Sequence, residues 1–537
     1  MKNIKILKLQ LFALIGTAMF FTACTNDLEV SPKDDDDFTS EQFFANPSSY
    51  KQFLAKIYGG LAVTGQIGPA SNYPDGDPAP DIQGIDEGFG QYLRGLWQLQ
   101  ELPTDEAMVS WGDPTLPELN NHTWNADNRF VRAFYARVHY QVGLVNEYLR
   151  QTTDEKLDAR GVTAAMKAEI KTFRAEARFL RALSYYHGID IFGKVSFSTE
   201  NDNVGTNPRQ ASRAEVFDYI VNELNAIDGD LLASRTNEYG RVDKVAAKML
   251  LAKMYLNAQV FIGVNKDTEA LTAINSVIGS TYSIANVPYG DLFRADNDRA
   301  AVQSEIIFPI RFDGINTKTW GGTTFIIHAA TGSWNSEMGV DGGWYGLAAR
   351  KEFADLFSDL TGGIDNRAIF DASSPLNITA VSDFFSAGGL KVKKFKNRTS
   401  TGIQGSNQTH ADTDFPVFRL ADAYLMYAEL AAKGLASKAT ARGYVNQLRT
   451  RANATTLMSD SDITSQFVLD ERARELYWEG HRRQDLIRFN QFAGSTKLWQ
   501  WKGNVAAGTS IDSKYNLFPI PQTELNTNSN LTQNTGY

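Results

Sequence analysis

Two long segments of the chain carry apolar residues at the three- and four-residue steps of an amphipathic helix. The first runs from Asn128 to Arg150 and the second from Met166 to Phe192. In each segment the apolar positions share one face, which must be buried against another element. These positions are Phe130, Phe134, Val138, Val142, Val145 and Leu149, then Ile170, Phe173, Ala177, Leu180, Leu183 and Tyr186. We predict two helices that pack as an antiparallel pair.

Shorter segments along the rest of the chain repeat this periodicity. Ser212 and Glu215 form a capping-box signature that predicts a helix through Leu224. Further helical segments are expected at 43–61, 244–260, 268–278, 416–433, 439–452 and 462–489. Paired helices of this size are typical of tetratricopeptide-like arrays. The pattern therefore predicts a mainly α, tetratricopeptide-like helical solenoid.

A large irregular insert interrupts the helical pattern. Glycine turns alternate there with short apolar runs, at 304–311 and 323–327, that have the length and composition of strands. The segment 391–396 alternates lysine with apolar residues, so we expect a half-exposed strand whose charges face solvent. We predict a single domain over residues 41–537, with a helical scaffold at about 41–280 and 411–537 and a loop and short-strand insert at about 281–410.

The N-terminus has the organisation of an export signal. Three lysines precede an apolar run from Leu11 to Phe21, which is too short for a permanent membrane span. Cys24 follows, and it is the only cysteine in the sequence. A cysteine at this place resembles the lipidation site of bacterial lipoproteins. We predict a signal peptide over residues 1–23, lipidation of Cys24 and an acidic tether over residues 24–40.

Charge and motifs exclude several functions. The formal net charge is −9, and loss of the signal lysines moves it to −12, so nucleic acid is not an expected ligand. Catalytic and phosphate-binding signatures are absent from the sequence, and the six histidines lack metal-ligand spacing to one another. Paired carboxylates that meet only in space could still serve a glycoside hydrolase.

A segment rich in glycine and tryptophan stands out at residues 319–345. It holds Trp320, Trp334 and Trp344, three of the nine tryptophans of the chain, between pairs of glycines that favour turns. Flat aromatic side chains on a loop with few titratable neighbours suit a flat, uncharged ligand such as a sugar ring. The alternative is that these tryptophans belong to the core, and the segment itself does not decide between the two.

Two other sets of charged residues have candidate roles. Asp298, Asp412 and Asp414 lie in acidic, oxygen-rich turns that suit Ca²⁺ or simply cap local structure. Residues 471–488 alternate acidic and basic side chains at three-residue steps, as in Glu471 and Arg474, between apolar residues. We expect this second set to form structural ion pairs in a packed helix.

Several long motifs, in the same order, resemble the SusD/RagB family of outer-membrane glycan-binding lipoproteins. They lie at residues 175–186, 192–194, 415–424 and 471–489. The acidic residues that follow Cys24 also resemble the surface-export signal of Bacteroidetes lipoproteins. The resemblance implies a tetratricopeptide-like fold, a lipid anchor in the outer membrane facing the cell exterior, and a SusC-type TonB-dependent transporter as partner.

Within this family the chain is most similar to the starch-binding member, which has close counterparts of residues 101–106, 240–247 and 499–503. That resemblance implies binding of starch or maltooligosaccharides without catalysis. It places glycan contacts on Trp111, Trp320 and Trp344, here called the tryptophan arc, with Arg94 as a polar contact. It also implies a cation at the acidic turns, so a structural Ca²⁺ held by Asp298, Asp412 and Asp414 is predicted.

The chain departs from the starch-binding pattern at three places. Trp320 replaces a tyrosine, Val109 stands where that member has a further tryptophan, and its hydrogen-bonding asparagine is replaced around Pro114. Three alternatives stay open at this point: another glycan such as a β-glucan, a glycoside hydrolase, or a structural surface protein of the same fold.

Overall fold

The computed structural model describes residues 39–66, 68–69, 80–386 and 388–537. The chain divides into two compact units, Met1–Ser49 and Tyr50–Tyr537. In the first unit, Thr39 caps the short helix α2 (Ser40–Phe44) through a capping box with Gln42. The signal peptide, Cys24 and most of the predicted tether lie outside the described residues. The second unit contains the elements described below.

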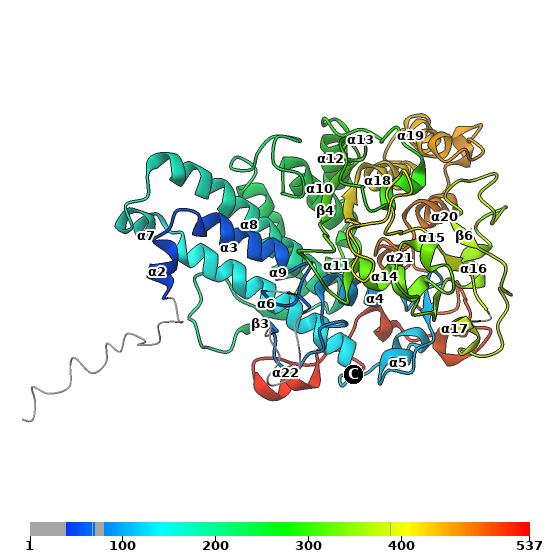
Figure 1. Cartoon of the computed structure of the whole chain (residues 1–537), viewed down its shortest axis with the longest axis horizontal. Coiled ribbons are helices and arrows are strands. Elements are labelled where there is room, and N and C mark those ends of the chain that lie inside the picture. Colours follow the sequence, from blue (N-terminus) through cyan, green and yellow to red (C-terminus); the bar gives the residue numbers. More distant parts are fainter. Residues whose placement is uncertain (1–38, 67, 70–79, 387) are drawn as a thin grey trace, which may run out of the picture. The chain divides into compact units, whose positions relative to one another are not determined.

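Two long helices dominate the first half of the second unit, as predicted. They are α6 (Arg129–Gln151) and α8 (Ala164–Ile191), which pack against each other (Figure 1). Asn128 and Thr163 cap their N-termini by accepting hydrogen bonds from backbone N–H groups. The predicted helix 43–61 is instead divided into α2 and α3 (Ser49–Gly59), with Pro47 between them.

The next helices also match their predicted partners. Ser212 opens α9 (Arg213–Ala226) with the expected capping box. Helix α10 (Lys244–Leu256) packs against α12 (Asp267–Ile278), and α12 in turn packs against α18 (Leu420–Ala432). Helix α18 packs against both α19 (Lys438–Arg451) and α20 (Ser465–Leu476). These successive helix pairs, with only short antiparallel strands among the described residues, confirm the mainly α, tetratricopeptide-like class.

The remaining elements are short. The other helices are α4 (Tyr92–Glu101), α5 (Leu116–Asn121), α7 (Asp154–Ala159), α11 (Ala258–Ile262), α13 (Ala300–Gln303), α14 (Gly322–Ala330), α15 (Asn335–Met338), α16 (Lys351–Ala354), α17 (Asp383–Ser386), α21 (Arg482–Arg488) and α22 (Gln522–Thr527). Single 3₁₀ turns occur at Tyr289–Phe293, Asp460–Asp462, Lys502–Asn504 and Ser513–Asn516. Among the described residues, no helix is both long and apolar enough to cross a membrane.

The described residues of this unit form four two-stranded antiparallel pairs, and two of them, β1–β5 and β4–β8, join segments that are far apart in the sequence. They are β1 (Met108–Val109) with β5 (Leu347–Ala348), β2 (Val195–Phe197) with β3 (Arg209–Ala211), β4 (Ile306–Ile310) with β8 (Phe415–Arg419), and β6 (Phe370–Asp371) with β7 (Lys391–Val392). The strand predicted at 304–311 is therefore β4. The predicted helix 416–433 starts later, at Leu420, because its first residues belong to β8.

Two expectations for the insert were wrong: the strand at 323–327, and the solvent exposure of 391–396, although β7 confirms a strand at Lys391–Val392. Residues 323–327 lie in helix α14, which is buried on all sides, so its apolar residues show no amphipathic period. The lysines of 391–396 do not face solvent: Lys391, Lys394 and Lys396 are all buried. Lys394 donates hydrogen bonds to Glu479 Oε1 at 2.7 Å and to the carbonyl of Tyr477 at 2.6 Å. Carboxylates far away in the sequence neutralise two of these charges: Glu479 pairs with Lys394, and Glu337 pairs with Lys396 at 2.6 Å.

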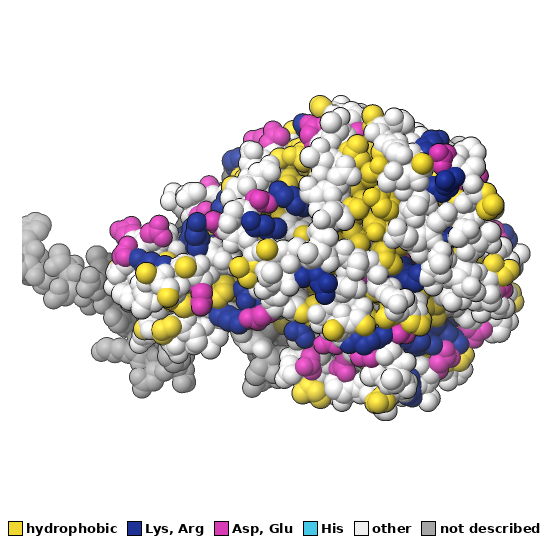
Figure 2. Space-filling model, turned by 90° about the horizontal axis from the view of Figure 1, so that it is seen from above, with side chains coloured by type: hydrophobic (Ala, Val, Ile, Leu, Met, Phe, Trp, Pro, Cys, Tyr) yellow, Lys and Arg dark blue, Asp and Glu magenta, His cyan; other side chains and the backbone are white. Residues whose placement is uncertain are grey.

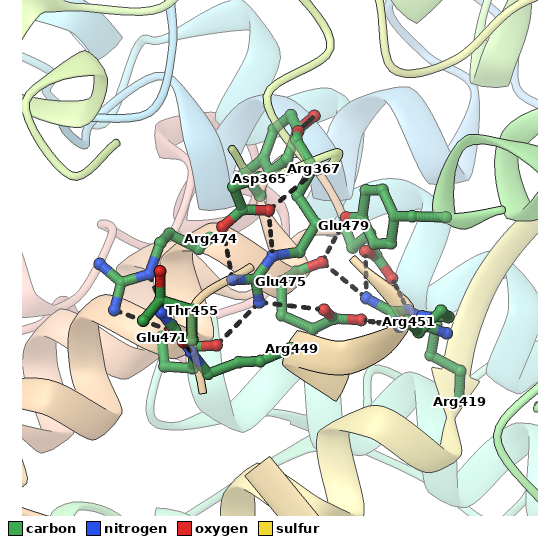
Figure 3. Close-up of polar contacts among 12 residues, drawn as sticks. Asp365, Arg367, Arg419, Arg449, Arg451, Thr455, Glu471, Arg474, Glu475 and Glu479 are labelled. Atoms are coloured by element: carbon green, nitrogen blue, oxygen red, sulfur yellow. Dashed lines mark hydrogen bonds and ion pairs between the residues drawn. The ribbon is translucent and has the colours of Figure 1, made fainter. Parts of the chain in front are cut away.

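A buried ion-pair network connects the insert to the C-terminal helices (Figure 3). Arg419, at the end of β8, contacts Glu475 at 2.7 Å and Glu479 at 2.6 Å. Arg367 contacts Glu471 at 2.8 Å, and the side chains of all five residues are at most 1% exposed. Arginines and Lys394 pair with these carboxylates, which supports the interpretation that the charged segment has a structural role.

The predicted ion pairs along residues 471–488 are found only in part. Glu471 pairs with Arg474 and Asp485 with Arg488, as the spacing indicated. Glu479 does not pair with Arg482, because the chain leaves the helix after Leu476 and α21 begins only at Arg482. The predicted helix 462–489 is accordingly two helices.

Arg482 makes a different contact. Its guanidinium donates two hydrogen bonds of 2.7 Å to the carboxylate of Asp105, and both side chains are buried. This bidentate pair connects α21 to the segment that follows α4, 377 positions earlier in the chain.

Candidate functional site

The structure brings the tryptophan arc together from three distant segments. Trp111 follows β1, Trp344 precedes β5, and Trp320 precedes α14. The β1–β5 ladder pairs Val109 with Leu347, and it continues through a hydrogen bond from Ser110 N to Gly346 O of 2.9 Å. A two-residue ladder therefore places Trp111 beside Trp344.

Trp344 occupies the middle of the arc. Its ring centroid lies 6.2 Å from that of Trp111 and 6.2 Å from that of Trp320, with interplanar angles of 49° and 52°. Since each ring is tilted by about the same angle relative to the middle ring, the rings are not coplanar. Neighbouring rings tilted in this way can stack on a ligand whose successive flat units are also tilted relative to one another.

Solvent exposure separates the arc from the core tryptophans. Trp320 is 38% exposed, and Trp111 and Trp344 are half-buried. Trp97, Trp124, Trp478 and Trp499 are the core tryptophans, each at most 2% exposed. The interpretation of the arc residues as core side chains is therefore not supported. Trp334, also half-buried, has Lys393 Nζ 4.5 Å from its ring centroid.

Two histidines support the arc from behind. His328 stacks on Trp344 with ring centroids 4.7 Å apart, and the ring of His410 lies 4.7 Å from that of Trp320. Burial lowers the pKa of both imidazoles, so they are neutral in neutral solution. This arrangement could not be predicted from the sequence, because the two histidines are far apart in the chain and have no recognisable spacing to a tryptophan.

Arg94 lies on α4 directly beside the arc. Its Nη1 donates a hydrogen bond of 3.1 Å to the carbonyl of Trp320, and its guanidinium lies over the ring of Phe325 at 4.2 Å and that of Trp111 at 5.9 Å. Burial lowers the pKa of Arg94 to about 10, which leaves it cationic at neutral pH. Its buried Nε has no hydrogen-bond partner among the described residues.

Residues of the segment before α4 hold the loop that carries Trp320. Glu87 accepts hydrogen bonds from Trp320 N at 3.0 Å and from Thr319 Oγ1 at 2.8 Å. Gln91 accepts from Gly322 N at 2.9 Å, and a Cβ atom at Gly321 would lie 2.4 Å from the Cβ of Gln91. The glycines after Trp320 are therefore required by close backbone approach. Glu87 acts here as a buried support for the loop.

The departures from the starch-binding pattern have different structural consequences. Val109 is fully buried in β1, where it pairs with Leu347, so its side chain belongs to the support behind the site. Pro114 is exposed, three residues after Trp111.

The three predicted calcium ligands do not form a suitable cluster. Both carboxylate oxygens of Asp412 accept hydrogen bonds, from Gly314 N, Ser406 N and Ser406 Oγ. Asp298 and Asp414 each face Arg311, at 3.8 and 3.9 Å. Among the described residues, no group of three or more His, Cys, Asp or Glu side chains is arranged to hold a metal ion.

The cation between Asp298 and Asp414 is thus a guanidinium. Burial raises the pKa of Asp414 to about 7, and Phe312 N donates to its Oδ1. The donor set around these carboxylates does not fit Ca²⁺.

The face seen from above mixes charges of both signs (Figure 2). Lysine and arginine side chains lie beside aspartate and glutamate side chains there, and hydrophobic side chains gather in a central band. Such a mixed surface lacks the basic patch that typically binds nucleic acid.

Comparisons with known proteins agree with the fold. A model of the SusD family matches residues 377–537. The starch-binding protein SusD of Bacteroides thetaiotaomicron is 35% identical, over 96% of this chain and 96% of that protein.

Solved structures of SusD-like proteins are also similar to this chain in fold. A SusD superfamily protein of Parabacteroides distasonis superposes with a TM-score of 0.70 at 22% identity, over 93% of this chain and all of that one. Surface glycan-binding protein A of Bacteroides thetaiotaomicron, in complex with laminarihexaose, gives a TM-score of 0.65 at 20% identity, over 90% of this chain and 98% of that one. Identity above 30% across almost the full length of a curated relative shows the family. The chain belongs to the SusD family.

Proposed function

We propose that this protein binds starch-derived α-glucan oligosaccharides without catalysis, on the tryptophan arc. The observation that carries the proposal is the arrangement of Trp111, Trp344 and Trp320 as successive, partly exposed rings tilted by about 50°. A helical α-1,4-glucan presents a curved apolar edge, and each ring can stack on one glucose unit. The relative with 35% identity is named as a starch-binding protein, which supports the same choice.

Arg94 has two roles in this proposal. Its hydrogen bond to the Trp320 carbonyl and its position over two aromatic rings fix the arc. Its remaining N–H groups can donate to sugar hydroxyls at the edge of the rings. A neutral polysaccharide requires no further charge at the site, and the buried carboxylate of Glu87 is committed to the Trp320 loop.

A second candidate ligand is a β-glucan. A family relative of this fold was solved with laminarihexaose, although its 20% identity shows only the shared fold. Calorimetric titration with maltoheptaose and laminarihexaose compares the two ligands directly. We expect tighter binding of maltoheptaose; tighter binding of laminarihexaose would replace α-glucan by β-glucan and leave the family unchanged.

The same samples test the remaining alternatives. New reducing ends after incubation with maltoheptaose would indicate a glycoside hydrolase. Failure to bind either oligosaccharide would favour a structural surface protein. We expect binding with no new reducing ends.

The proposal includes a cellular setting. Lipidated Cys24 anchors the protein in the outer membrane, facing the cell exterior, and a SusC-type TonB-dependent transporter receives the bound glycan. The sequence pattern around Cys24 and membership of the family support this setting. Co-purification of the lipidated protein with such a transporter from outer membranes tests it.

A further inference from the structure

A second pair of aromatic side chains lies next to the tryptophan arc. Tyr345 follows Trp344 directly, and its ring stacks on Phe385 with centroids 5.7 Å apart and planes at 23°. Phe385 is 47% exposed. A single exposed phenylalanine is common on protein surfaces and does not by itself indicate a binding site. Here, however, the exposed ring stacks on the residue that directly follows Trp344 of the arc.

The backbone of Tyr345 is held in an unfavourable conformation. Its φ of 60° is in the left-handed region, which is uncommon for a bulky residue and favours glycine. Glycines stand at positions 343 and 346, on either side of Trp344 and Tyr345. A bulky aromatic side chain at a strained backbone position is a feature that clusters at ligand-binding sites.

Hydrogen bonds fix this conformation and couple it to the arc. The indole Nε1 of Trp111 donates to the carbonyl of Tyr345 at 2.9 Å. Tyr345 N donates to Thr331 O at 3.1 Å, and Trp344 N to His328 O at 2.8 Å. One residue of the arc therefore directly holds the backbone that presents the second aromatic pair.

Phe385 is also firmly placed, on helix α17. Its neighbour Phe384 is fully buried in a cluster with Met108 of β1 and Ala348 of β5. The Phe384 carbonyl accepts a hydrogen bond of 2.8 Å from the buried Lys391. The same two strands thus position both Phe385 and the arc, so the exposed ring has a fixed relation to it.

We propose that Tyr345 and Phe385 form an additional stacking subsite, which takes a further sugar unit of the glycan chain bound by the tryptophan arc. One face of Phe385 stacks on Tyr345, and the 47% exposure of the residue leaves surface for contact with a sugar ring. This inference rests on the proposed function. The subsite makes the binding affinity depend on the length of the glycan. The three tryptophans accommodate a trisaccharide, and a longer glycan also reaches Phe385.

Calorimetric titration with maltotriose and maltoheptaose tests the subsite. Phe385→Ala should weaken maltoheptaose binding about fivefold or more, the lower end for one aromatic stacking contact. It should leave maltotriose binding unchanged. Phe385→Trp should restore the affinity for maltoheptaose. Tyr345→Gly should have the same effect as Phe385→Ala, because glycine adopts this φ without strain.

Met458→Ala is the matched control, since Met458 is 85% exposed and lies in a different segment, before α20. It should change neither titration. Equal maltoheptaose affinity in the wild type and Phe385→Ala overturns the subsite, as does an equal loss for both oligosaccharides.

A separate variant distinguishes this failure from that of the proposed function. Trp344→Ala should weaken the binding of both oligosaccharides. If it does so while Phe385→Ala has no effect, the arc stands and the subsite is refuted. If the wild-type protein binds neither oligosaccharide, both proposals are refuted.

Discussion

The imidazole of His328 lies nearly parallel to the indole of Trp344, with an interplanar angle of 23°. Its two ring nitrogens face carbonyls on both sides, Gly342 O at 2.6 Å and Thr409 O at 3.1 Å. A neutral imidazole has one N–H, so it donates to only one of these carbonyls. His328 therefore fixes the middle ring of the arc by stacking on it and by holding the loop beside it.

The stacking of His328 on Trp344 predicts that a substitution of His328 changes glycan binding indirectly, through Trp344. His328→Ala should weaken maltoheptaose binding, because Trp344 loses the surface behind it, whereas His328→Phe should keep more of the affinity. Since burial lowers the pKa of His328 from its usual 6.5, the affinity should be constant between about pH 7 and 9. An affinity that changes steadily over this range would contradict a neutral His328.

Removal of an arc tryptophan should weaken binding without unfolding the protein. Trp320→Ala and Trp344→Ala should each cost about 1–3 kcal/mol of binding free energy, by analogy with base–aromatic stacking, or roughly five- to 150-fold in affinity. Trp97→Ala, at a fully buried position, should instead cost about 3–5 kcal/mol of stability. Calorimetry and thermal melts of the three variants separate the two effects. Intact binding with a collapsed melting temperature in Trp320→Ala would refute the stacking role.

The buried network predicts a pH dependence of stability at low pH. Burial raises the pKa of Glu471 and Glu475, but neighbouring arginines outweigh it and hold both at about 2. Because the folded pKa lies below the unfolded value of about 4.5, their contribution is fully present above about pH 4.5. It is lost as the pH falls from there through about 2. Melting curves across this range should show a progressive loss.

Glu475→Gln provides the matched variant. It should be destabilised at pH 7, because it removes one of the buried carboxylates that pair with Arg419 and Arg451, and should lose less stability than the wild type on acidification. An identical acid response in both proteins would exclude this carboxylate as a contributor.

Lipidation of Cys24 predicts a change of location. A lipidated N-terminus is needed for stable membrane residence, so Cys24→Ala should abolish association with the outer membrane. Fractionation and protease accessibility of intact cells measure this. Cys24→Ala protein that is still membrane-bound and surface-accessible would refute the assignment.

Calcium was predicted from acidic turns, and the arrangement around Arg311 leads to a different expectation. Since the carboxylates of Asp412 and Asp414 accept hydrogen bonds and Asp298 faces a guanidinium, chelation should not change the melting temperature. Melts in the presence of a chelator and of added Ca²⁺ test this directly. A melting temperature that rises with Ca²⁺ would restore the metal site.

The sequence predicted elements best where periodicity was long and strictly amphipathic, as in α6 and α8. It failed at 323–327, because a short apolar run in a fully buried helix has no polar face to reveal its period. It also failed for Lys394, whose burial depends on Glu479, a residue far away in the chain. The sequence pattern around Lys394 does not indicate a partner that lies so far away in the chain.

The candidate site was predictable through resemblance and much less through local chemistry. Trp320 and Trp344 stood out as aromatic residues between glycines, but Trp111 joins them only because the two-residue β1–β5 ladder forms. His328, Tyr345 and Phe385 had no signal in the sequence, since their roles follow from stacking across segments that the sequence does not show to be neighbours.

The pair between Asp105 and Arg482 has a consequence for biosynthesis. A chain released before residue 482 leaves the Asp105 carboxylate buried without its guanidinium, a costly state in a low-dielectric interior. Contacts across 377 positions also form slowly, because a long loop must close first. Helices such as α6 and α8 can pair while synthesis continues, whereas the region around α4 reaches its final state only after α21 has emerged. The fold around Asp105 therefore depends on a residue that is synthesised late, and a chain that lacks residue 482 cannot complete it.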